Sequence, residues 1–400
     1  MVSERSGSSS YWIWLLALFT MAGFIEAGFY GQVSAFTPLY LPQLGIPPAD
    51  VPRWTGLIAA VTSAIGIPFL PFWGALADRY ARQPIIIRSY VAHLLGGLFM
   101  LIAGNVWVFS LGRTAMSFSL GNSGLMMTTL SERTPTRRLG LAFSIMNGAS
   151  PMGLFVGPLV GGFVLDAFGF PALMFVNCLV IVGVILVLTL GYRDNFKGTD
   201  RGSLLRMAAD SLGIIWRSLR LRLLFPALFL LFGGWVMAFT YVPLATAALY
   251  RGADTGQVVG LVVATGGLTT LVVSPLIGAL ADRLGHWRVL FVGAAISVLL
   301  WPVPALAPNL VAFAIAWALV NGVASAVFAI SFTVLSGSAA SDVRGRVMSF
   351  AFLPVNVGSM VGPALGSAIT TASVFTVFPV AAVITLLGIG TLALAARLPA

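Results

Sequence analysis

Long apolar runs dominate this sequence and leave few folds open to it. Predominantly apolar stretches of about 20 residues, the length needed to cross a bilayer, recur from Trp12 to Leu398 between short connections. Only 8% of the 400 residues are charged, and the mean hydropathy is +0.99. A soluble domain carries about 25% charged residues. The chain lacks the polar side chains for an aqueous surface, and we predict an integral membrane protein.

The apolar runs are predicted to form an all-α protein with twelve transmembrane helices. Open strands cannot satisfy their backbone groups in lipid, and the runs are too long for barrel strands. No small-residue cleavage site follows the first run, so we expect an uncleaved first span. The predicted spans are 12–41, 55–76, 84–104, 106–130, 140–165, 172–191, 223–250, 256–281, 288–306, 308–337, 344–369 and 372–395.

The basic residues lie almost entirely on one side of these spans. If the N-terminus is cytoplasmic, nineteen of the 22 Lys and Arg residues face the cytoplasm, whereas Arg53 and Arg251 face outward and Arg113 lies within a span. The positive-inside rule therefore predicts that both termini are cytoplasmic. Arginines spread over separate loops do not form the single basic face of a nucleic-acid-binding protein, so the net charge of +10 reflects topology.

One charged hexapeptide occurs twice in the chain. Gly-Ala-Leu-Ala-Asp-Arg stands at 74–79 and again at 278–283, and a second pair of similar segments covers 137–162 and 344–367. These pairs indicate duplication of a six-helix unit. Six is an even number, so both units enter the membrane in the same orientation. We predict two parallel six-helix bundles related by a pseudo-two-fold axis.

This duplication divides the chain into three predicted parts. Each bundle contains one copy of the repeat, and the charged stretch between them is expected to be a cytoplasmic linker with an amphipathic helix on the membrane surface. The parts are an N-terminal bundle at 1–191, the linker at 192–222 and a C-terminal bundle at 223–400.

The repeated motifs resemble those of the major facilitator superfamily over the whole chain. The stretch GALADRYARQ resembles the motif in the loop between helices two and three of that superfamily, and the second copy resembles its degenerate partner between helices eight and nine. Ala81 and Gln83 depart from the usual pattern, as does Ser117 after the fourth-span arginine. The motif residues are Gly74, Asp78, Arg79, Arg82, Gly278, Asp282 and Arg283.

A second motif resembles that of the superfamily's drug:proton antiporters. Arg113 stands where their membrane-embedded arginine lies in the fourth helix. Small residues at every fourth position let neighbouring helices approach closely. The fifth-span motif could therefore serve helix packing alone or a gating movement, and both interpretations stay open. The fifth-span residues that carry the resemblance are Gly153, Gly157, Pro158, Gly161 and Gly162.

The resemblance implies a cytoplasmic gate made by the two loop motifs. Asp78 would contact the start of the eleventh span near Arg344, and Asp282 the start of the fifth near Arg138, when the transporter faces outward. A carboxylate is stabilised at a helix N-terminus. The alternative is that both loops are solvated and only set the topology.

Glu26 is the most informative single residue, because an ionisable group deep in a span is costly and indicates function. It lies about 21 Å from the cytoplasmic end of its span, and Arg113 lies at about the same depth in a core of about 30 Å. We predict that the two pair and couple transport to protons. The alternative is a structural pair that neutralises a buried arginine. His93 is predicted to be a packing histidine, and Asp166 an ordinary interfacial charge.

The central cavity is predicted to have an apolar and aromatic wall with scattered polar groups. Aromatic faces together with one negative group favour lipophilic cations. The predicted wall consists of Tyr30, Gln32, Phe118, Asn122, Asn147, Trp235, Phe239, Tyr241, Trp317, Asn321 and Asn356.

The resemblance implies a proton-coupled exporter of small lipophilic, cationic compounds such as drugs, working by alternating access as a monomer in a bacterial cytoplasmic membrane. Its partners would be the substrate, protons and the bilayer. No cofactor or metal is expected, because two histidines and Cys178 give no ligand cluster and no phosphate-binding loop is present. The alternatives are export of a sugar, lipid or siderophore-like metabolite, and an intramembrane lipid-modifying enzyme, which lacks a catalytic constellation here.

Cysteine labelling in intact cells tests the predicted orientation. Single cysteines placed within 192–222 should react only with reagents that reach the cytoplasm, and cysteines within 42–53 should react from outside, because the arginine bias fixes the sidedness. A Cys178→Ser background supplies the unlabelled control. Labelling of the linker from outside would contradict the twelve-span topology.

Overall fold

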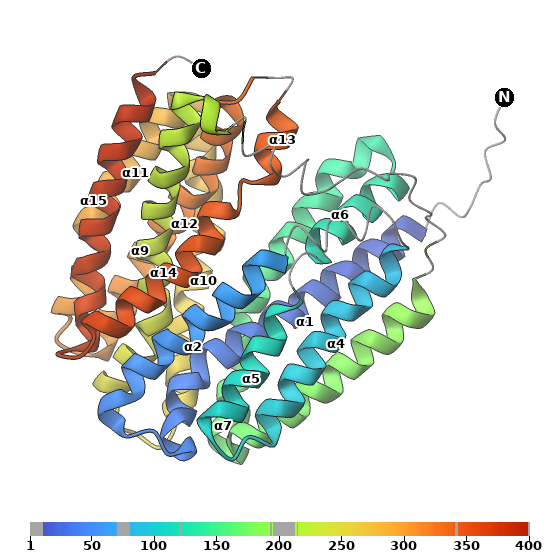
Figure 1. Ribbon diagram of the computed structural model, residues 1–400, viewed down its shortest axis with the longest axis vertical. Coiled ribbons are helices and arrows are strands. Elements are labelled where there is room, and N and C mark those ends of the chain that lie inside the picture. Colours follow the sequence, from blue (N-terminus) through green and yellow to red (C-terminus); the bar gives the residue numbers. More distant parts are fainter. Residues whose placement is uncertain are drawn as a thin grey trace.

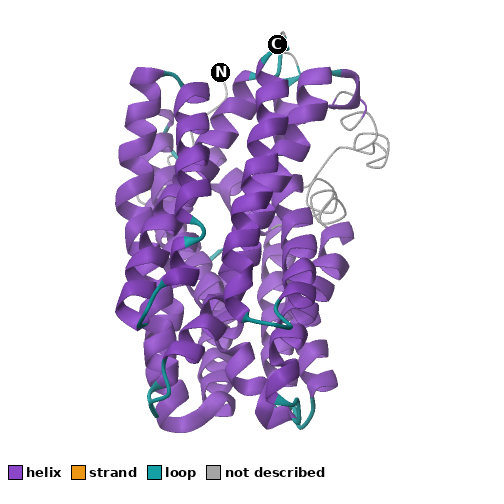
Figure 2. Ribbon diagram, turned by 90° about the vertical axis from the view of Figure 1, so that its left-hand side faces the viewer, coloured by secondary structure: helices purple, strands orange, loops and turns teal. Residues whose placement is uncertain are grey.

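The part of the chain that the structure describes is helical throughout (Figure 2). The structure is a computed structural model, and it describes residues 11–69, 81–119, 122–192, 194, 213, 215–340 and 343–398. Strands do not occur in these ranges. Gly74, Asp78 and Arg79 of the predicted gate, and most of the predicted linker, lie outside the described residues.

The helices follow the apolar runs of the sequence. Short 3-10 turns extend or connect several of them, among them Leu41–Leu44 after α1 and Thr136–Arg138 before α7. The α-helices are α1 Tyr11–Tyr40, α2 Val51–Gly66, α4 Arg82–Leu101, α5 Val106–Ser117, α6 Asn122–Arg133, α7 Leu139–Gly191, α9 Leu219–Leu249, α10 Thr255–Leu284, α11 His286–Leu300, α12 Leu310–Gly337, α13 Arg344–Ser349, α14 Leu353–Ile369 and α15 Val377–Ala396.

Many of these helices suit a bilayer. Within the described residues, eight helical segments are long and apolar enough to cross a membrane, and α14 is a shorter apolar helix. Large apolar side chains such as Ile102, Leu190 and Leu299 are exposed on the outer surface. An apolar outer surface of this extent is stable only in lipid. The chain is therefore an integral membrane protein.

One long helix corresponds to two predicted spans, and two other predicted spans are divided. Helix α7 covers two predicted spans and breaks at Gly169, whose φ of +81° suits glycine and leaves two helices that meet there. The predicted span 106–130 is divided, because α5 ends at Ser117 and a turn follows it. The predicted span 344–369 is likewise divided into α13 and α14.

The helices form two groups that meet at one end (Figure 1). The N-terminal group comprises α1, α2 and α4–α7, and the C-terminal group comprises α9–α15. In Figure 1 the groups lie against each other in the lower part of the view and diverge toward the upper part. Most of the contact is made by two helix pairs, α2 with α14 and α7 with α10.

Glycines permit the close approach of these helix pairs. A Cβ atom on Gly260 of α10 would overlap the Pro158 carbonyl oxygen of α7, and one on Gly56 of α2 would overlap the Pro363 carbonyl oxygen of α14. Tyr241 of α9 adds a polar contact, since its hydroxyl lies 3.2 Å from the Pro52 carbonyl oxygen. Small residues at a helix contact let the backbones pack directly. The contact end is consequently closed by backbone against backbone.

Asp166 links the two groups through the start of α10. Its carboxylate accepts hydrogen bonds of 2.8 Å from the backbone N–H groups of Gly256 and of Gln257. The first N–H groups of a helix have no partner within the helix, and a negative charge there is favoured by the helix dipole. The interfacial charge predicted from the sequence is therefore an N-terminal cap supplied by the opposite group.

The other face of α7 packs against α1. A Cβ on Gly153 or Gly157 would overlap the backbone of α1 at Phe24 or Gly28. Gln32 Nε2 donates to the Gly157 carbonyl oxygen at 3.0 Å. The fifth-span glycine motif thus has two faces, one toward α1 and one, with Pro158 and Gly162, toward α10.

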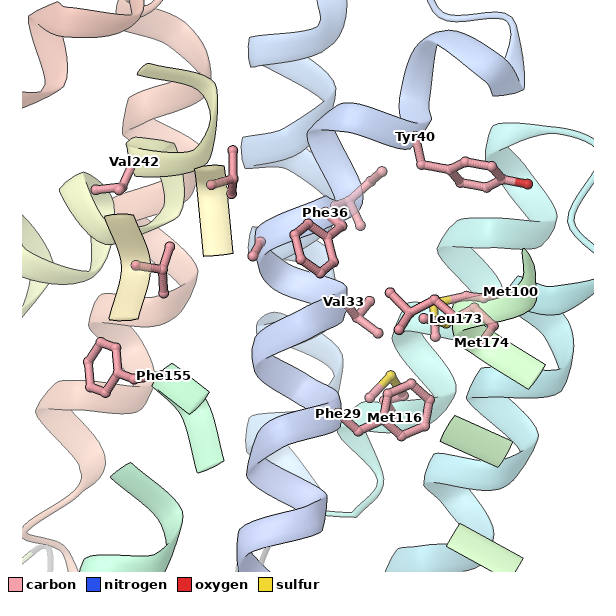
Figure 3. Packing of buried hydrophobic residues seen from close by; sticks show 14 of the residues in the cluster. Phe29, Val33, Phe36, Tyr40, Met100, Met116, Phe155, Leu173, Met174 and Val242 are labelled. Atoms are coloured by element: carbon pink, nitrogen blue, oxygen red, sulfur yellow. The ribbon is translucent and has the colours of Figure 1, made fainter. Parts of the chain in front are cut away.

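A buried apolar cluster holds α1 against the rest of its group. Phe29 and Val33 of α1 belong to the same cluster as Met100 of α4, Met116 of α5 and Met174 of α7 (Figure 3). Flexible methionines fill irregular gaps between packed helices. The cluster fixes the position of α1, which carries several of the predicted site residues.

Replacing Asp166 with alanine is expected to open the contact end. The variant leaves two backbone N–H groups of α10 unpaired, and we expect the ratio of closed to open molecules at this end to fall by at least about tenfold, or about 1.4 kcal/mol. Distances between spin labels on the outer ends of α7 and α10, measured by pulsed electron resonance, check this. Asp254→Ala, at a carboxylate that accepts only from Tyr250 of its own group, is the matched control. An unchanged distance distribution in Asp166→Ala would show that the cap does not hold the groups together.

Candidate functional site

Glu26 lies in a polar cluster formed by α1, α4 and α6. Its side chain is 14% exposed, and His93 Nδ1 lies 3.6 Å from Oε1. Asn122 Nδ2 donates a hydrogen bond of 2.5 Å to Oε2. His93 Nδ1 also lies 3.2 Å from the carbonyl oxygen of Ser89. The carboxylate therefore has a fixed donor on one oxygen and an imidazole beside the other.

Two more residues of α4 act on this carboxylate. Arg88 contributes a positive charge near Glu26, and the buried hydroxyl group of Tyr90 lies close to it. Arg88 and Tyr90 thus add a positive charge and a hydroxyl group to the surroundings of Glu26.

The roles of His93 and Asn122 in this cluster differ from the sequence predictions. His93 was predicted to be a packing residue, and Asn122 to line the cavity. His93 lies eleven residues from the start of α4, about 16 Å along the helix, which is a depth comparable to that of Glu26. The depth argument that selects Arg113 would also have selected His93. Asn122 is the first residue of α6, and only the division of the fourth span places it beside Glu26.

Arg113 lies apart from this cluster, on α5. It is 4% exposed, and its Nε and Nη1 atoms have no hydrogen-bond partner. The guanidinium carbon lies 5.4 Å from the centre of the Tyr30 ring, a cation–π contact. Among the described residues, no carboxylate forms an ion pair with Arg113. Tyr30 is one helical turn beyond Glu26 on α1, so the arginine faces the next turn.

A cavity of about 280 Å³ lies between the two helix groups. Arg113 and Tyr30 line it from the N-terminal group, and Trp235 and Phe239 of α9 line it from the C-terminal group. Among the described lining residues, Arg113 is the one ionisable side chain besides the phenol of Tyr30. The remaining lining residues are Gly31, Ser34, Ala35, Thr37, Thr55, Ile58, Ala59, Leu154, Val236, Thr240, Pro243, Val263, Val355 and Ser359.

Several predicted wall residues make structural contacts beside the cavity. Asn321 accepts a hydrogen bond of 3.0 Å from Trp235 Nε1 and donates to the Gly266 carbonyl oxygen at 2.8 Å. Its amide thereby fixes the indole that faces the cavity. The predicted wall residues absent from the lining are Gln32, Phe118, Asn122, Asn147, Tyr241, Trp317, Asn321 and Asn356.

These residues have other surroundings. Gln32 Oε1 accepts from Asn177 Nδ2 at 2.6 Å, Trp317 is fully buried, and Phe118 packs on Phe69 with ring centres 5.0 Å apart. Asn147 is exposed and Asn356 half-buried. The sequence gives no signal that separates a cavity-facing residue from one turned to a neighbouring helix, because that depends on helix rotation.

The described residues of the predicted gate lie at the end where the groups diverge. Asp282 is 75% exposed and lies 3.1 Å from His286 Nε2, one turn along the same chain segment. Gly278 has open space around its Cα atom, and Arg283 is exposed. Asp282 does not contact the start of α7 in this conformation.

Arg82, the remaining described gate residue, forms a contact within the N-terminal group. Its two terminal nitrogens each lie 2.8 Å from one oxygen of Glu132, at the end of α6. Its backbone N–H donates to Asp194 at 2.7 Å. A paired two-point contact of this kind is strong and directional. Arg82 therefore ties the start of α4 to α6, a partnership that the sequence analysis did not identify.

Comparison with known proteins places this architecture in a family. The profile of the Major Facilitator Superfamily matches residues 18–257 and 245–400. The chain is 26% identical to the multidrug resistance protein MdtG of Rahnella sp. (strain Y9602) over 373 residues, which cover 92% of this chain and 90% of that protein. It is 26% identical to the MdtG protein of Salmonella typhi over 356 residues, 87% of each chain.

Solved transporter structures share the fold. The POT family transporter PepTSo superposes with a TM-score of 0.75 at 16% identity, covering 96% of this chain and 97% of that chain. A bacterial homologue of the human lysosomal transporter Spinster, in an inward-facing and unoccupied conformation, superposes with a TM-score of 0.76 at 14% identity, covering 98% and 100%. The chain belongs to the Major Facilitator Superfamily, whose members are membrane transporters and not enzymes.

Proposed function

We propose that this protein is a proton-coupled exporter of small lipophilic compounds that works by alternating access. The observation that carries the proposal is the cavity between the two helix groups, which both groups line, with Glu26 and its polar contacts one turn of α1 away from Tyr30 of the lining. The similarity to MdtG multidrug resistance proteins over about nine-tenths of both chains supports export of drugs. An apolar cavity with few polar groups is typical of sites for lipophilic molecules.

The proposed architecture has twelve crossings in two parallel bundles related by a pseudo-two-fold axis, with bundles at 1–191 and 223–400 and a linker at 192–222. Counting α5 with α6 and α13 with α14 as one crossing each, and α7 as two, supports this number. The protein would act as a monomer in a bacterial inner membrane with both termini in the cytoplasm, as the arginine bias predicts.

In this orientation, the closed end of the structure faces outward. Asp166 and the start of α2 at Val51 both belong to the end where the groups meet, and both belong to the outer ends of the predicted spans. The ends of α6 at Arg133 and of α10 at Arg283 belong to the diverging end. The conformation is thus proposed to be open toward the cytoplasm, the state that takes up a substrate for export.

The lipophilic character of the substrate follows from the lining, but its charge does not follow from Glu26. The cationic preference predicted from the sequence requires Glu26 to face the substrate, and here it belongs to the α1–α4–α6 cluster, outside the cavity lining. Export of a sugar is disfavoured, because a sugar needs many hydrogen-bonding groups and the walls are mainly apolar. Lipid-like or siderophore-like metabolites with apolar bodies remain the second candidate class.

Proton coupling is proposed to reside on Glu26, with Asn122 and His93 as its contacts. Glu26→Gln cannot release a proton, so we expect it to abolish proton flux that is coupled to substrate. Purified protein in liposomes that contain a pH-sensitive dye, given a panel of lipophilic compounds of both charges, measures this flux.

Two variants calibrate this measurement. Asn122→Ala removes the donor to Oε2 and should reduce the flux in part, whereas Asp254→Asn, at a carboxylate outside the cluster, should leave it unchanged. Flux in Glu26→Gln equal to that of the parent would remove Glu26 from the proton path. Absence of any substrate-coupled flux in the parent would overturn proton-coupled export itself.

Asp282 is proposed to close the cytoplasmic side in the outward-facing state, together with Asp78. Because Asp282 is exposed here and near only His286 among the described residues, Asp282→Asn should leave substrate binding unchanged and lower turnover by about fivefold or more, the loss of roughly 1 kcal/mol from one state. His286→Ala, which removes only the present neighbour, is the control and should transport like the parent. If Asp282→Asn and His286→Ala both transported at the rate of the parent, the loop would only set the topology.

A further inference from the structure

The central cavity contains a buried positive charge without a counter-charge. Arg113 is 4% exposed and lines the cavity, and its Nε and Nη1 atoms have no hydrogen-bond partner. Burying a charge is expensive unless a partner of opposite sign or good hydrogen bonds compensate for it. The contact with the face of Tyr30 compensates only in part.

Glu26, the carboxylate that was predicted to pair with Arg113, has other partners. Glu26 receives a hydrogen bond from Asn122 and has His93 and Arg88 beside it. It does not form an ion pair with Arg113. The charge of Arg113 is therefore not neutralised by Glu26. It acts on a ligand that enters the cavity.

The other polar atoms of the lining point to the same conclusion. The hydroxyl groups of Thr55 and Thr240 donate to main-chain carbonyl oxygens one turn earlier in their own helices. Thr37 and Ser359 are engaged in the same way. Ser34 is different, because its buried hydroxyl has no partner. Within the part of the chain that the structure describes, no carboxylate lines the cavity. Among the described lining residues, the polar groups not bonded to a main-chain carbonyl oxygen or to a neighbouring amide are thus the Arg113 guanidinium, the Ser34 hydroxyl and the phenol of Tyr30.

We propose that this cavity binds amphipathic organic anions, with the acidic group of the ligand at Arg113 and Ser34. The apolar body would lie between Trp235, Phe239, Ile58 and Val263. A volume of about 280 Å³ lies just below the usual range for small-molecule sites, which suits a ligand with one or two rings. A carboxylate, sulfonate or phosphonate accepts hydrogen bonds from a guanidinium group, whereas an organic cation is repelled by it.

This inference rests on the proposed function for the direction of transport but not for binding. Inward movement of one proton with outward movement of one anion shifts positive charge inward twice, so a membrane potential that is negative inside favours both movements. Each elementary charge contributes about 2.3 kcal/mol per 100 mV. The exchange of a proton for an anion is therefore driven more strongly than the exchange of a proton for a cation.

The test is direct binding to the purified full-length protein, measured by titration calorimetry in lipid nanodiscs without a pH gradient. Three probes share one aromatic body and differ in charge: naphthylacetate, naphthylethanol and naphthylmethylammonium. We expect naphthylacetate to bind at least about tenfold more tightly than naphthylmethylammonium, with the neutral alcohol between them. Equal or tighter binding of the cation by the parent protein would overturn the proposal, and this comparison needs no variant to fold.

Variants then locate the anion preference. Arg113→Gln should weaken naphthylacetate binding by about tenfold or more and leave naphthylethanol nearly unchanged, Arg113→Lys should retain most of the anion preference, and Ser34→Ala should weaken anion binding by about threefold. The matched control is Arg220→Gln, because Arg220 also lies over an aromatic ring, that of Trp287 at 5.1 Å, but outside the cavity. Unchanged anion affinity in Arg113→Gln would overturn the proposal.

The outcomes separate this inference from the proposed function. Anion-selective binding without any substrate-coupled proton flux would sustain the anion site and refute proton-coupled export. Proton-coupled transport of cations, with the cationic probe bound more tightly than the anionic one, would sustain proton-coupled export and refute the anion site.

Discussion

The absence of water in the hydrocarbon core is the constraint on which the rest of this structure depends. Every backbone polar group in lipid must find its partner within the protein, so the described chain is helical and its turns lie near helix ends. Because a charge is costly in the hydrocarbon core, most charged side chains lie at the ends of the helices. Glu26, His93 and Arg113 are exceptions inside the N-terminal group, and each is held by contacts that lipid cannot provide.

Helix α7 packs against both helix groups, and its contacts determine where the cavity between them lies. Its glycines at 153 and 157 bring it against α1, and Pro158 and Gly162 bring its other side against α10. The backbone contact between α7 and α10 brings the two groups directly together. The space between the groups therefore appears beyond this contact, where Leu154 of α7 faces Tyr30 and Trp235. The Asp166 cap on α10 fixes the same contact with charge-assisted hydrogen bonds.

Properties that follow from composition and local pattern were predictable from the sequence. The positions of the apolar helices and the family follow from hydrophobic length and from the repeated motif, and they agree with the helix bounds and the superfamily match. The break at Gly169 was also anticipated as a boundary between two spans. Contacts between distant residues were not predictable in this way. His93, Glu132 and Asn122 acquire their partners through helix rotation and through the division of the fourth span, and neither leaves a mark in the hydrophobic pattern.

The separation of Glu26 from the cavity determines what kind of coupling this fold can support. Proton and substrate would not compete for one group, so their coupling free energy must arise from different affinities of two conformations for each of them. Helix α1 is the element common to both sites, because Glu26, Tyr30 and Ser34 follow one another at intervals of four residues and share one face. Gly28 and Gly31 of the same helix pack on the α7 backbone. If Glu26 is the proton site, as proposed, a rotation or slide of α1 along α7 would move Tyr30 relative to Arg113. The proposed proton site and the cavity would then be coupled through the position of one helix.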